Sequence, residues 1–370
     1  MKSLVKILIV ISVLWFSIST VEAYTYTVSG GGLTVGGNPP TTSNTTVNDE
    51  LQLQFNDAID RAYNELFKYS DLPDLAKGFA NANAYAGQAG TLQGYQDYKL
   101  FAVTAGAMVG AQLPSHDKDY YENLDKKVEK DGDLYAGVGA SLALLNVGIN
   151  AGFIYPNLYL NAKFGYFSNS SLVDGLSTKT TLVGIGANYS WIKTTSFLAG
   201  LFKWRGISFG TGFIYSYNKT DLKIDMDPIQ EDITPVGPIT GNVVLNPSFL
   251  IGVESHTYSI PFDVTTSVRV LWALNFNLGL GVDLNFGSTD IKLESDGSVS
   301  ANLSGAGAPT VTPGNYTVDA TTKNKKPSWV RERITTGVGL NIWAVKIDVP
   351  VIIYPFDNAF AVGLTAGVVW

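Results

Sequence analysis

The chain has 370 residues, of which 45% are hydrophobic, 12% are aromatic and only 15% are charged, and its formal net charge is −7. Soluble proteins carry about 25% charged residues, so this composition disfavours an ordinary water-soluble fold. The negative charge disfavours nucleic acid as a partner, and the lack of cysteine excludes disulfide bonds, thiolate metal sites and a cysteine-linked lipid anchor.

The first 23 residues have the pattern of an export signal. Lys2 and Lys6 precede an apolar stretch at 7–16, and residues 21–23 (VEA) resemble a cleavage site. The apolar stretch is shorter than the roughly 20 residues that a membrane-spanning helix needs, so an uncleaved anchor is the less favoured alternative. We expect residues 1–23 to be removed on export.

Residues 24–95 predict a leader and a plug. The segment 24–47 is rich in Gly, Thr, Asn and Pro and has no helix or strand period. Apolar residues then recur at three- and four-residue spacing over 48–69, which predicts an amphipathic helix that Leu72-Pro73 ends. The packing face of this helix is predicted to hold Phe55, Ile59 and Leu66.

The segment 74–95 is small and polar with scattered aromatic residues. It is too apolar to hang free in water and too short to form a domain of its own. We therefore expect 24–95 as a whole to pack in or under the rest of the protein as a partly helical plug.

From about residue 96 to Trp370 the apolar residues follow a period of two, which is the period of a β-strand. In 274–286 every second residue is Leu, Phe or Val, and the residues between them are Asn, Gly and Asp. Such long strands with one apolar and one polar face predict an all-β fold, a transmembrane antiparallel β-barrel of about 12–14 strands in the bacterial outer membrane. The predicted strands are 98–110, 134–144, 147–154, 157–167, 181–191, 205–217, 242–253, 263–272, 274–286, 330–342, 344–354 and 360–370.

The connections between these strands are of two kinds. Short turns are expected at 155–157, 272–273 and 343–344, and aromatic residues near them, Tyr159 and Tyr354 among them, are expected at the lipid–water boundary. Short turns are typical of the periplasmic side and long loops of the external side. Long polar loops are expected at 112–133, 218–241, 287–297 and 301–327.

The final segment 360–370 alternates apolar with small residues and ends on Trp370. This ending resembles the last strand of bacterial outer-membrane barrels, which implies that Trp370 belongs to the signal read by the barrel-insertion machinery. Outer-membrane lipid and that machinery are therefore the expected partners of the barrel.

Charged residues fall on the face of the strands that is predicted to line the lumen. One interpretation is a charged constriction that selects solutes. The other, which we favour, is a polar interior of cross-strand pairs that fills a small barrel. The predicted lumen residues are Arg269, Arg331, Arg333, Asp263 and Asp283, with Lys163 and Lys346 on the same face.

The sequence predicts no enzyme, no cofactor and no metal site. The two histidines are His116 and His256, and the neighbour Ser255 lies on the opposite strand face from His256, so the two cannot act as a nucleophile–base pair. The acidic and basic residues of 112–133 match no calcium loop, and a solvated external loop is the favoured interpretation.

Two family resemblances accompany these patterns. The small-residue stretch NANAYAGQAG and the strand KWRGISFGTGFIYS at 203–216 resemble the FadL-type transporters, which implies a hatch, a barrel and a route for hydrophobic ligands. The segments 78–103 and 269–293 resemble the Lsa-type surface adhesins of spirochaetes, which implies that exposed loops bind host matrix proteins and plasminogen.

Three functions follow from these observations, in order of expectation. The first is passive transport of small, hydrophobic molecules across the outer membrane. The second is a surface-exposed adhesin or structural barrel with a closed lumen. The third, a distant last, is a barrel hydrolase that uses His256.

Overall fold

The computed structural model describes residues 27–29, 34–36, 53–54, 57, 72–87, 98–113, 136–173, 175–225, 228–233, 238–305, 308 and 310–370. The predicted export signal, the plug residues Phe55, Ile59 and Leu66, and most of the predicted loop 112–133 lie outside this described part. Within it, α3 and every other helical segment fall short of the length and apolarity that a membrane-crossing helix requires.

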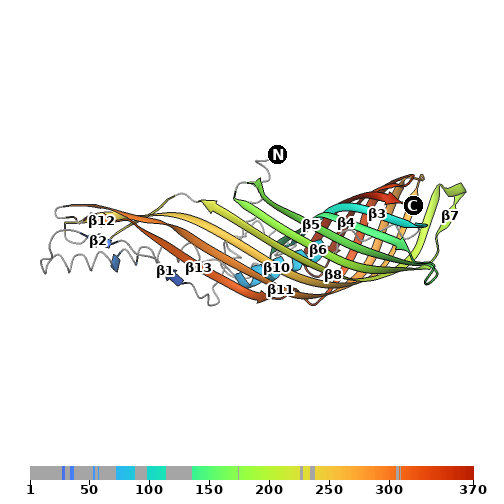
Figure 1. Ribbon diagram of the computed structural model, residues 1–370, viewed down its shortest axis with the longest axis horizontal. Helices are drawn as coiled ribbons and strands as arrows, with labels where there is room; N and C mark the ends of the chain where they lie inside the picture. Colours follow the sequence, from blue (N-terminus) through green and yellow to red (C-terminus); the bar gives the residue numbers. More distant parts are fainter. Residues whose placement is uncertain are drawn as a thin grey trace.

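Ten antiparallel strands close a ring in the described part of the chain (Figure 1). The pairings run β10–β11–β14–β15–β16–β3–β4–β5–β6–β8 and return from β8 to β10. The ring strands are β3 Phe101–Gln112, β4 Gly137–Asn150, β5 Leu158–Val173, β6 Leu176–Ile192, β8 Phe202–Asp225, β10 Thr240–Val270, β11 Leu274–Ser304, β14 Val330–Ile342, β15 Val345–Tyr354 and β16 Ala359–Val369.

The predicted antiparallel barrel is confirmed. Among the described residues, ten strands of a 14-stranded sheet form its ring, fewer than the 12–14 strands expected. The strands outside the ring are β1 Thr27–Ser29, β7 Thr195–Phe197, β9 Ile229–Asp232 and β13 Gly314–Lys325. A separate small sheet pairs β2 Thr34–Gly36 with β12 Thr310–Thr312, and a 3-10 turn, η1, covers Leu198–Gly200.

Two predicted strand pairs are single strands. One strand, β4 (Gly137–Asn150), takes up most of the predicted segments 134–144 and 147–154. The pattern was broken because the pairing of β4 with β3 shifts register between Ser141 and Leu144, where an extra residue interrupts the alternation. The segments 242–253 and 263–272 form one strand of 31 residues, β10.

The outer wall of the ring is apolar. In β14, exposed and buried residues alternate without a break; Val338 and Leu340 are among the exposed ones and Arg331 and Arg333 among the buried ones. A continuous apolar surface on this scale is not stable in water, whereas an apolar band around a barrel suits the lipid bilayer.

Strands β10 and β11 continue far beyond the ring as an arm, which extends to the left in Figure 1. β11 pairs with β14 only as far as Leu284 and pairs with β13 from Thr289 to Val299. The part of β10 from Thr240 to Glu254 spans roughly 50 Å at ~3.4 Å per residue. The loops predicted at 218–241, 287–297 and 301–327 are thus wrong in large part, because β8, β9, β10, β11 and β13 occupy them.

The polarity of the two faces inverts where the arm begins. In the ring, the outward positions of β10 and β11 are apolar, as at Val264 and Leu280, which are both exposed. In the arm, the face of the same parity carries the exposed residues Asn246 and Asn302, joined to cross-strand partners by hydrogen bonds. The opposite face of the arm is apolar and buried, with Val243, Leu245, Val253, Ile291 and Val299. A strand that leaves the bilayer for water needs this inversion, which marks the membrane boundary.

The helix α3, Leu72–Gly87, lies inside the ring. It contacts β3 and β4 on one side and β8, β10 and β11 on the other (Figure 1). Leu72 and Pro73 are therefore the first residues of a helix, and the prediction that they end a helix is wrong. Proline is favoured in the first turn of a helix because its missing N–H has no partner to lose there.

Candidate functional site in the barrel lumen

The helix α3 rests on a floor of small residues. Its alanines Ala76, Ala80 and Ala82 are completely buried. The floor is so close that a Cβ on Gly139 of β4 would lie 2.5 Å from the carbonyl carbon of Ala82, and one on Gly78 of α3 would lie 2.0 Å from the carbonyl oxygen of Ala136. Only glycine permits this approach of backbone to backbone.

On its other side α3 is fastened by hydrogen bonds. The Asn83 amide donates to the hydroxyl of Thr257 at 3.0 Å and to that of Ser255 at 3.4 Å, both on β10. The Ser216 hydroxyl of β8 donates back to the Asn83 carbonyl oxygen at 3.2 Å. Asn83 therefore ties the plug helix to two neighbouring strands of the wall.

Tyr85 joins the helix to a third region of the wall. Its ring stacks on Tyr354 at the end of β15, with the ring centres 4.0 Å apart. Its hydroxyl donates to Gln112 Oε1 of β3 at 2.9 Å, and the guanidinium carbon of Arg331 lies 5.8 Å from its ring centre. Tyr85 is thus the contact between the helix and a cluster of charged residues.

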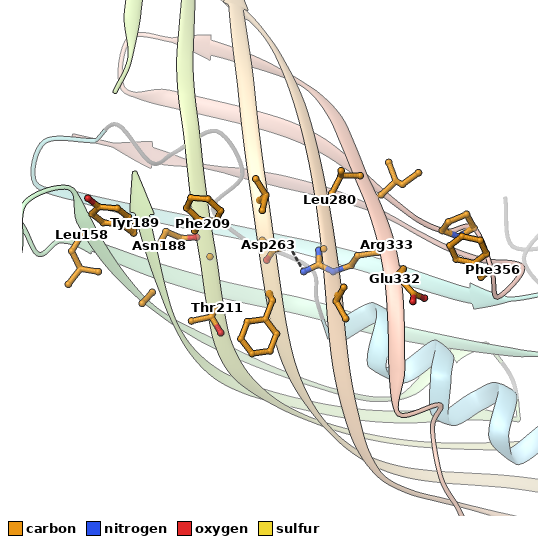
Figure 2. A pocket seen from close by; sticks show the side chains of 18 residues that line it. Leu158, Asn188, Tyr189, Phe209, Thr211, Asp263, Leu280, Glu332, Arg333 and Phe356 are labelled. Carbon is orange, nitrogen blue, oxygen red and sulfur yellow. Dashed lines mark ion pairs between the residues drawn. The ribbon is translucent and has the colours of Figure 1, made fainter. Parts of the chain in front are cut away.

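That cluster is centred on Arg333, whose side chain is completely buried. Its Nε donates to Asp283 Oδ1 at 2.9 Å, its Nη2 lies 2.5 Å from Asp263 Oδ1 (Figure 2), and its Nη1 donates to the Thr335 hydroxyl at 3.2 Å. The Tyr354 hydroxyl donates to the other oxygen of Asp283 at 3.3 Å. One guanidinium therefore compensates two buried carboxylates, and one of these carboxylates is linked through Tyr354 to α3.

A glycine makes the contact between Arg333 and Asp263 possible. Gly281 of β11 is the register partner of both residues, which lie on the strands to either side. A Cβ on Gly281 would lie 2.8 Å from Asp263 Oδ1 and 3.2 Å from Arg333 Cζ. The missing side chain lets the ion pair cross an intervening strand.

Of the residues predicted for the lumen, the structure brings four into this region. Arg331 is buried and forms an ion pair with Asp357, while Arg333 forms ion pairs with both Asp263 and Asp283. Lys163 of β5 is buried within electrostatic reach of Asp263 and Asp283.

Two other predicted residues lie at the short-turn end of the ring. Arg269 is opposite Asn275, close to the turn between β10 and β11. Lys346 is buried opposite Asn341, close to the turn between β14 and β15.

Trp370 follows directly on the strand that closes the ring. β16 pairs with β3 from Ala359 opposite Gln112 to Val369 opposite Ala102. The Trp370 N–H donates to the Phe101 carbonyl at 2.9 Å, and its side chain is 63% exposed. The last residue of the chain thus sits at the seam between the first and last ring strands.

His256 lies on the outer surface of the barrel, away from the lumen. Its Nδ1 is 2.9 Å from the Tyr215 hydroxyl, and its Nε2 is 3.6 Å from Glu254 Oε1. Ser255 is buried on the other face, where it forms a 2.6 Å hydrogen bond with Thr289. This placement separates the two side chains as the strand alternation requires.

Sequence reasoning missed two residues of the site and misplaced two aromatic residues. Asn83 and Tyr85 lie in a segment without apolar periodicity, so no signal marked them individually. Tyr354 and Tyr159 were expected at the lipid–water boundary, but both are buried inside the ring. For Tyr354 the parity of β15 was the available signal, because Ile352 on the same face is buried and Ile353 on the other is exposed.

A ring of antiparallel strands with an apolar outer wall and a polar interior occupied by a helix defines a membrane-spanning β-barrel of the outer-membrane class. The chain belongs to the Lsa36-like family, whose model matches residues 31–370. The resemblance to the Lsa-type proteins is therefore confirmed. No curated protein matches the chain.

Several solved structures are similar at low identity. The translocator domain of the autotransporter NalP from Neisseria meningitidis is 10% identical, with 79% of this chain and 99% of that chain covered and a TM-score of 0.29. The Ralstonia pickettii toluene transporter TbuX is 8% identical, with 79% and 97% covered and a TM-score of 0.24. A Pseudomonas aeruginosa FadL homologue is 8% identical, with the same coverage of 79% and 97% and a TM-score of 0.26.

Proposed function

We propose that this protein is a surface-exposed outer-membrane barrel with a closed lumen, whose arm binds an external protein. The single observation that carries the proposal is the inversion of polarity along β10 and β11. A strand pair that changes from an apolar to a polar outer face, and buries its other face, is built for water beyond the bilayer. The ring anchors this arm in the membrane.

The contents of the lumen support the closed state. The helix α3 touches opposite sides of the ring, and its alanines leave no space against the glycine floor. The Arg333 guanidinium of β14 and its carboxylate partners on β10 and β11 also bridge three strands inside the barrel. Interiors of small barrels are commonly filled by side chains in this way.

The direction of the arm follows from the turns. The connections at the end opposite the arm are all short, as at 271–273 and 343–344. The arm end has the short connections 174–175 and 355–358 and also the long ones, 113–136, 226–239 and 305–329. Short turns are usual on the periplasmic side, so the arm projects outward from the cell. Export through a cleaved signal at 1–23 is part of the same proposal.

The outer face of the arm offers amide and hydroxyl groups to a partner. Asn246 and Asn302 donate to Ser298 and Asn242 across β10 and β11, and all four lie on the exposed face. With the resemblance to Lsa-type adhesins, these groups favour a host matrix protein or plasminogen as the partner.

The orientation can be tested with single cysteines because the chain has none of its own. We expect Asn246→Cys in the arm to react with a membrane-impermeant maleimide on intact cells. The control Pro156→Cys, in the exposed turn between β4 and β5, should react only after permeabilisation. The reverse pattern would overturn the proposal.

Binding is tested by immobilising host matrix protein and plasminogen and adding the refolded barrel. The triple variant Asn242→Ala, Asn246→Ala and Asn302→Ala should bind at least about tenfold more weakly than wild type, since it removes several interfacial hydrogen bonds. The matched control, Lys99→Ala with Lys193→Ala at the other end of the barrel, should bind like wild type. Equal binding by the triple variant would rule out this face of the arm.

A second candidate is passive transport of small hydrophobic molecules through the barrel. The observation that favours it is the contact of α3 with the floor at Gly78, Gly137 and Gly139, which is made by backbone and small side chains. Such a helix could be displaced as a unit. Uptake of toluene into liposomes that contain the refolded protein would support this candidate, and uptake equal to that of empty liposomes would oppose it.

A further inference from the structure

A groove of about 950 Å³ runs across several strands on the surface of the barrel wall, and Figure 2 draws the residues that line it. Two rows of outward-pointing residues form its banks, and the turn residues Pro355 and Phe356 close one end. The first bank consists of Leu158, Tyr189, Phe209, Val264, Leu280 and Ile334, and the second of Ala187, Thr211, Phe262, Val282 and Glu332.

The groove lies on the lipid side of the wall and not in the lumen. Its bank residues include Phe262 and Leu280, which are 49% and 62% exposed. The residues between the banks, such as Gly210 and Gly281, contribute the floor. Three lumen-facing residues, Asn188, Asp263 and Arg333, also contribute to the floor, whereas Asp283 and Arg331 do not line the groove.

The groove runs diagonally from one edge of the ring to the other. The first bank is a continuous row of register partners from β5 through β6, β8, β10 and β11 to β14. At one end is Leu158, the first residue of β5 at the short-turn side. At the other end is Glu332, the third residue of β14 at the arm side, beside Phe356, which is 79% exposed. Because strands tilt in a barrel, this row connects the two surfaces of the bilayer.

Glu332 is out of place on an apolar wall. It is exposed, and the next outward residues of its strand are Val330 and Ile334. Its register partner on β11 is Val282. A carboxylate in this position calls for a cation from outside the protein, because the other charged residues that line the groove, Asp263 and Arg333, face the lumen and pair with each other.

We propose that the groove binds one membrane phospholipid whose headgroup carries a primary ammonium group. The acyl chains lie along the apolar banks, and the ammonium group donates to Glu332. The volume is within the usual range for ligand sites, ~300–1,000 Å³. Ala187 of β6 and Thr211 of β8, in the second bank, have small side chains and leave room for the acyl chains.

A second copy of the barrel fits the groove less well. A two-fold contact whose axis passes close to Glu332 would bring two Glu332 carboxylates together without a cation between them. Like charges brought together in a medium of low polarity repel strongly. The lipid is the occupant that supplies the opposite charge.

The test is native mass spectrometry of the refolded barrel, released from detergent after incubation with phosphatidylethanolamine or, separately, with phosphatidylcholine. Wild type should retain one phosphatidylethanolamine and prefer it by about tenfold, which is the worth of one charge-assisted hydrogen bond. Glu332→Gln should retain lipid without this preference. Ala187→Trp should retain neither lipid, because the indole fills the groove.

The matched control is Ala105→Trp, which places the same side chain at an exposed position of β3 outside the groove and should leave retention unchanged. Folding of each variant is checked by its heat-sensitive mobility in gel electrophoresis, and Thr211→Leu replaces Ala187→Trp if the latter does not fold. Unchanged lipid retention in the filled-groove variant, an undiminished preference in Glu332→Gln, or a lipid-free dimer would each overturn the proposal.

Discussion

At the scale of single residues, the lumen depends on one guanidinium that serves two carboxylates. Arg333 is buried with Asp263 and Asp283, and burial of charges is unfavourable unless each one has a partner. The Thr335 hydroxyl accepts a hydrogen bond from Arg333, and the Tyr354 hydroxyl donates one to Asp283. The cluster is therefore more sensitive to removal of the cation than to loss of any single hydrogen bond.

Replacing Arg333 by Met should lower the free energy of unfolding by about 3–5 kcal/mol, because it leaves two buried carboxylates without their cation. The measurement is urea unfolding of the refolded barrel in lipid vesicles. Lys193→Met, at an exposed position of a loop, should change it by less than about 0.5 kcal/mol. A loss in the Arg333 variant as small as that of the control would contradict the assigned role.

Gly281→Ala should lower the free energy of unfolding by about 1–3 kcal/mol, because the added Cβ would push Asp263 away from Arg333. The same unfolding experiment measures it. Gly87→Ala is the control, since a Cβ there would meet its nearest neighbour, Ser216 Cβ, at an ordinary 3.4 Å. If both variants unfold alike, Gly281 is not needed for the contact.

At the scale of elements, the period of two predicted the ring strands from local sequence alone. This prediction failed where the outward face of a strand changes from apolar to polar along its length. The outward face of β11 is apolar as far as Phe286 and polar from Ser288 onward, so the apolar alternation ends there although the strand continues to Ser304. A bulge in β4 produced the same kind of error.

The helix α3 and the charge cluster were harder to predict for a different reason. The helix has alanine, asparagine and glycine where a helix that packs on large side chains would have Leu or Ile, because its neighbour is a glycine floor. The alternation predicts that Asp263 and Arg333 lie on the lumen face, but it does not predict that they form an ion pair with each other. Their contact depends on β11 pairing with both β10 and β14, which is a property of the whole ring.

Gly139→Leu should loosen α3, because the side chain would occupy the space of the Ala82 backbone. We expect trypsin to cleave after Lys77 of α3 at least about tenfold faster, as overpacking costs ~1–3 kcal/mol of local stability. Cleavage is followed by mass spectrometry. Ala140→Leu, the next residue and on the lipid-facing side, is the control; equal cleavage of both variants would argue against the floor.

Trp370→Ser should slow insertion of the barrel into the outer membrane, since the aromatic end is the proposed assembly signal. The measurement is the amount of folded protein in outer-membrane fractions over time. Trp343→Ser changes another exposed tryptophan, in a short turn, and should insert at the wild-type rate. Normal outer-membrane levels of the Trp370 variant would refute the role of this residue.

At the scale of the whole molecule, the barrel and the arm have opposite polarity on their outer and inner faces. The ring has lipid outside and a polar, helix-filled interior, whereas the arm has water outside and an apolar face within. The N-terminal half of α3 packs on that apolar face through Leu75 and Ala76, against Val253 and Ile291. Its C-terminal half carries Tyr85 into the cluster of the ring. One helix therefore links the arm to the closure of the lumen.

The conductance of the refolded protein in a planar lipid bilayer tests the closed lumen most directly. Insertion is first verified by the heat-sensitive mobility of the folded protein. We expect no stable unitary steps from wild type, because in the proposed closed lumen α3 and the Arg333 cluster block the passage of ions. Stable unitary steps from folded wild-type protein would show an open lumen and contradict the account.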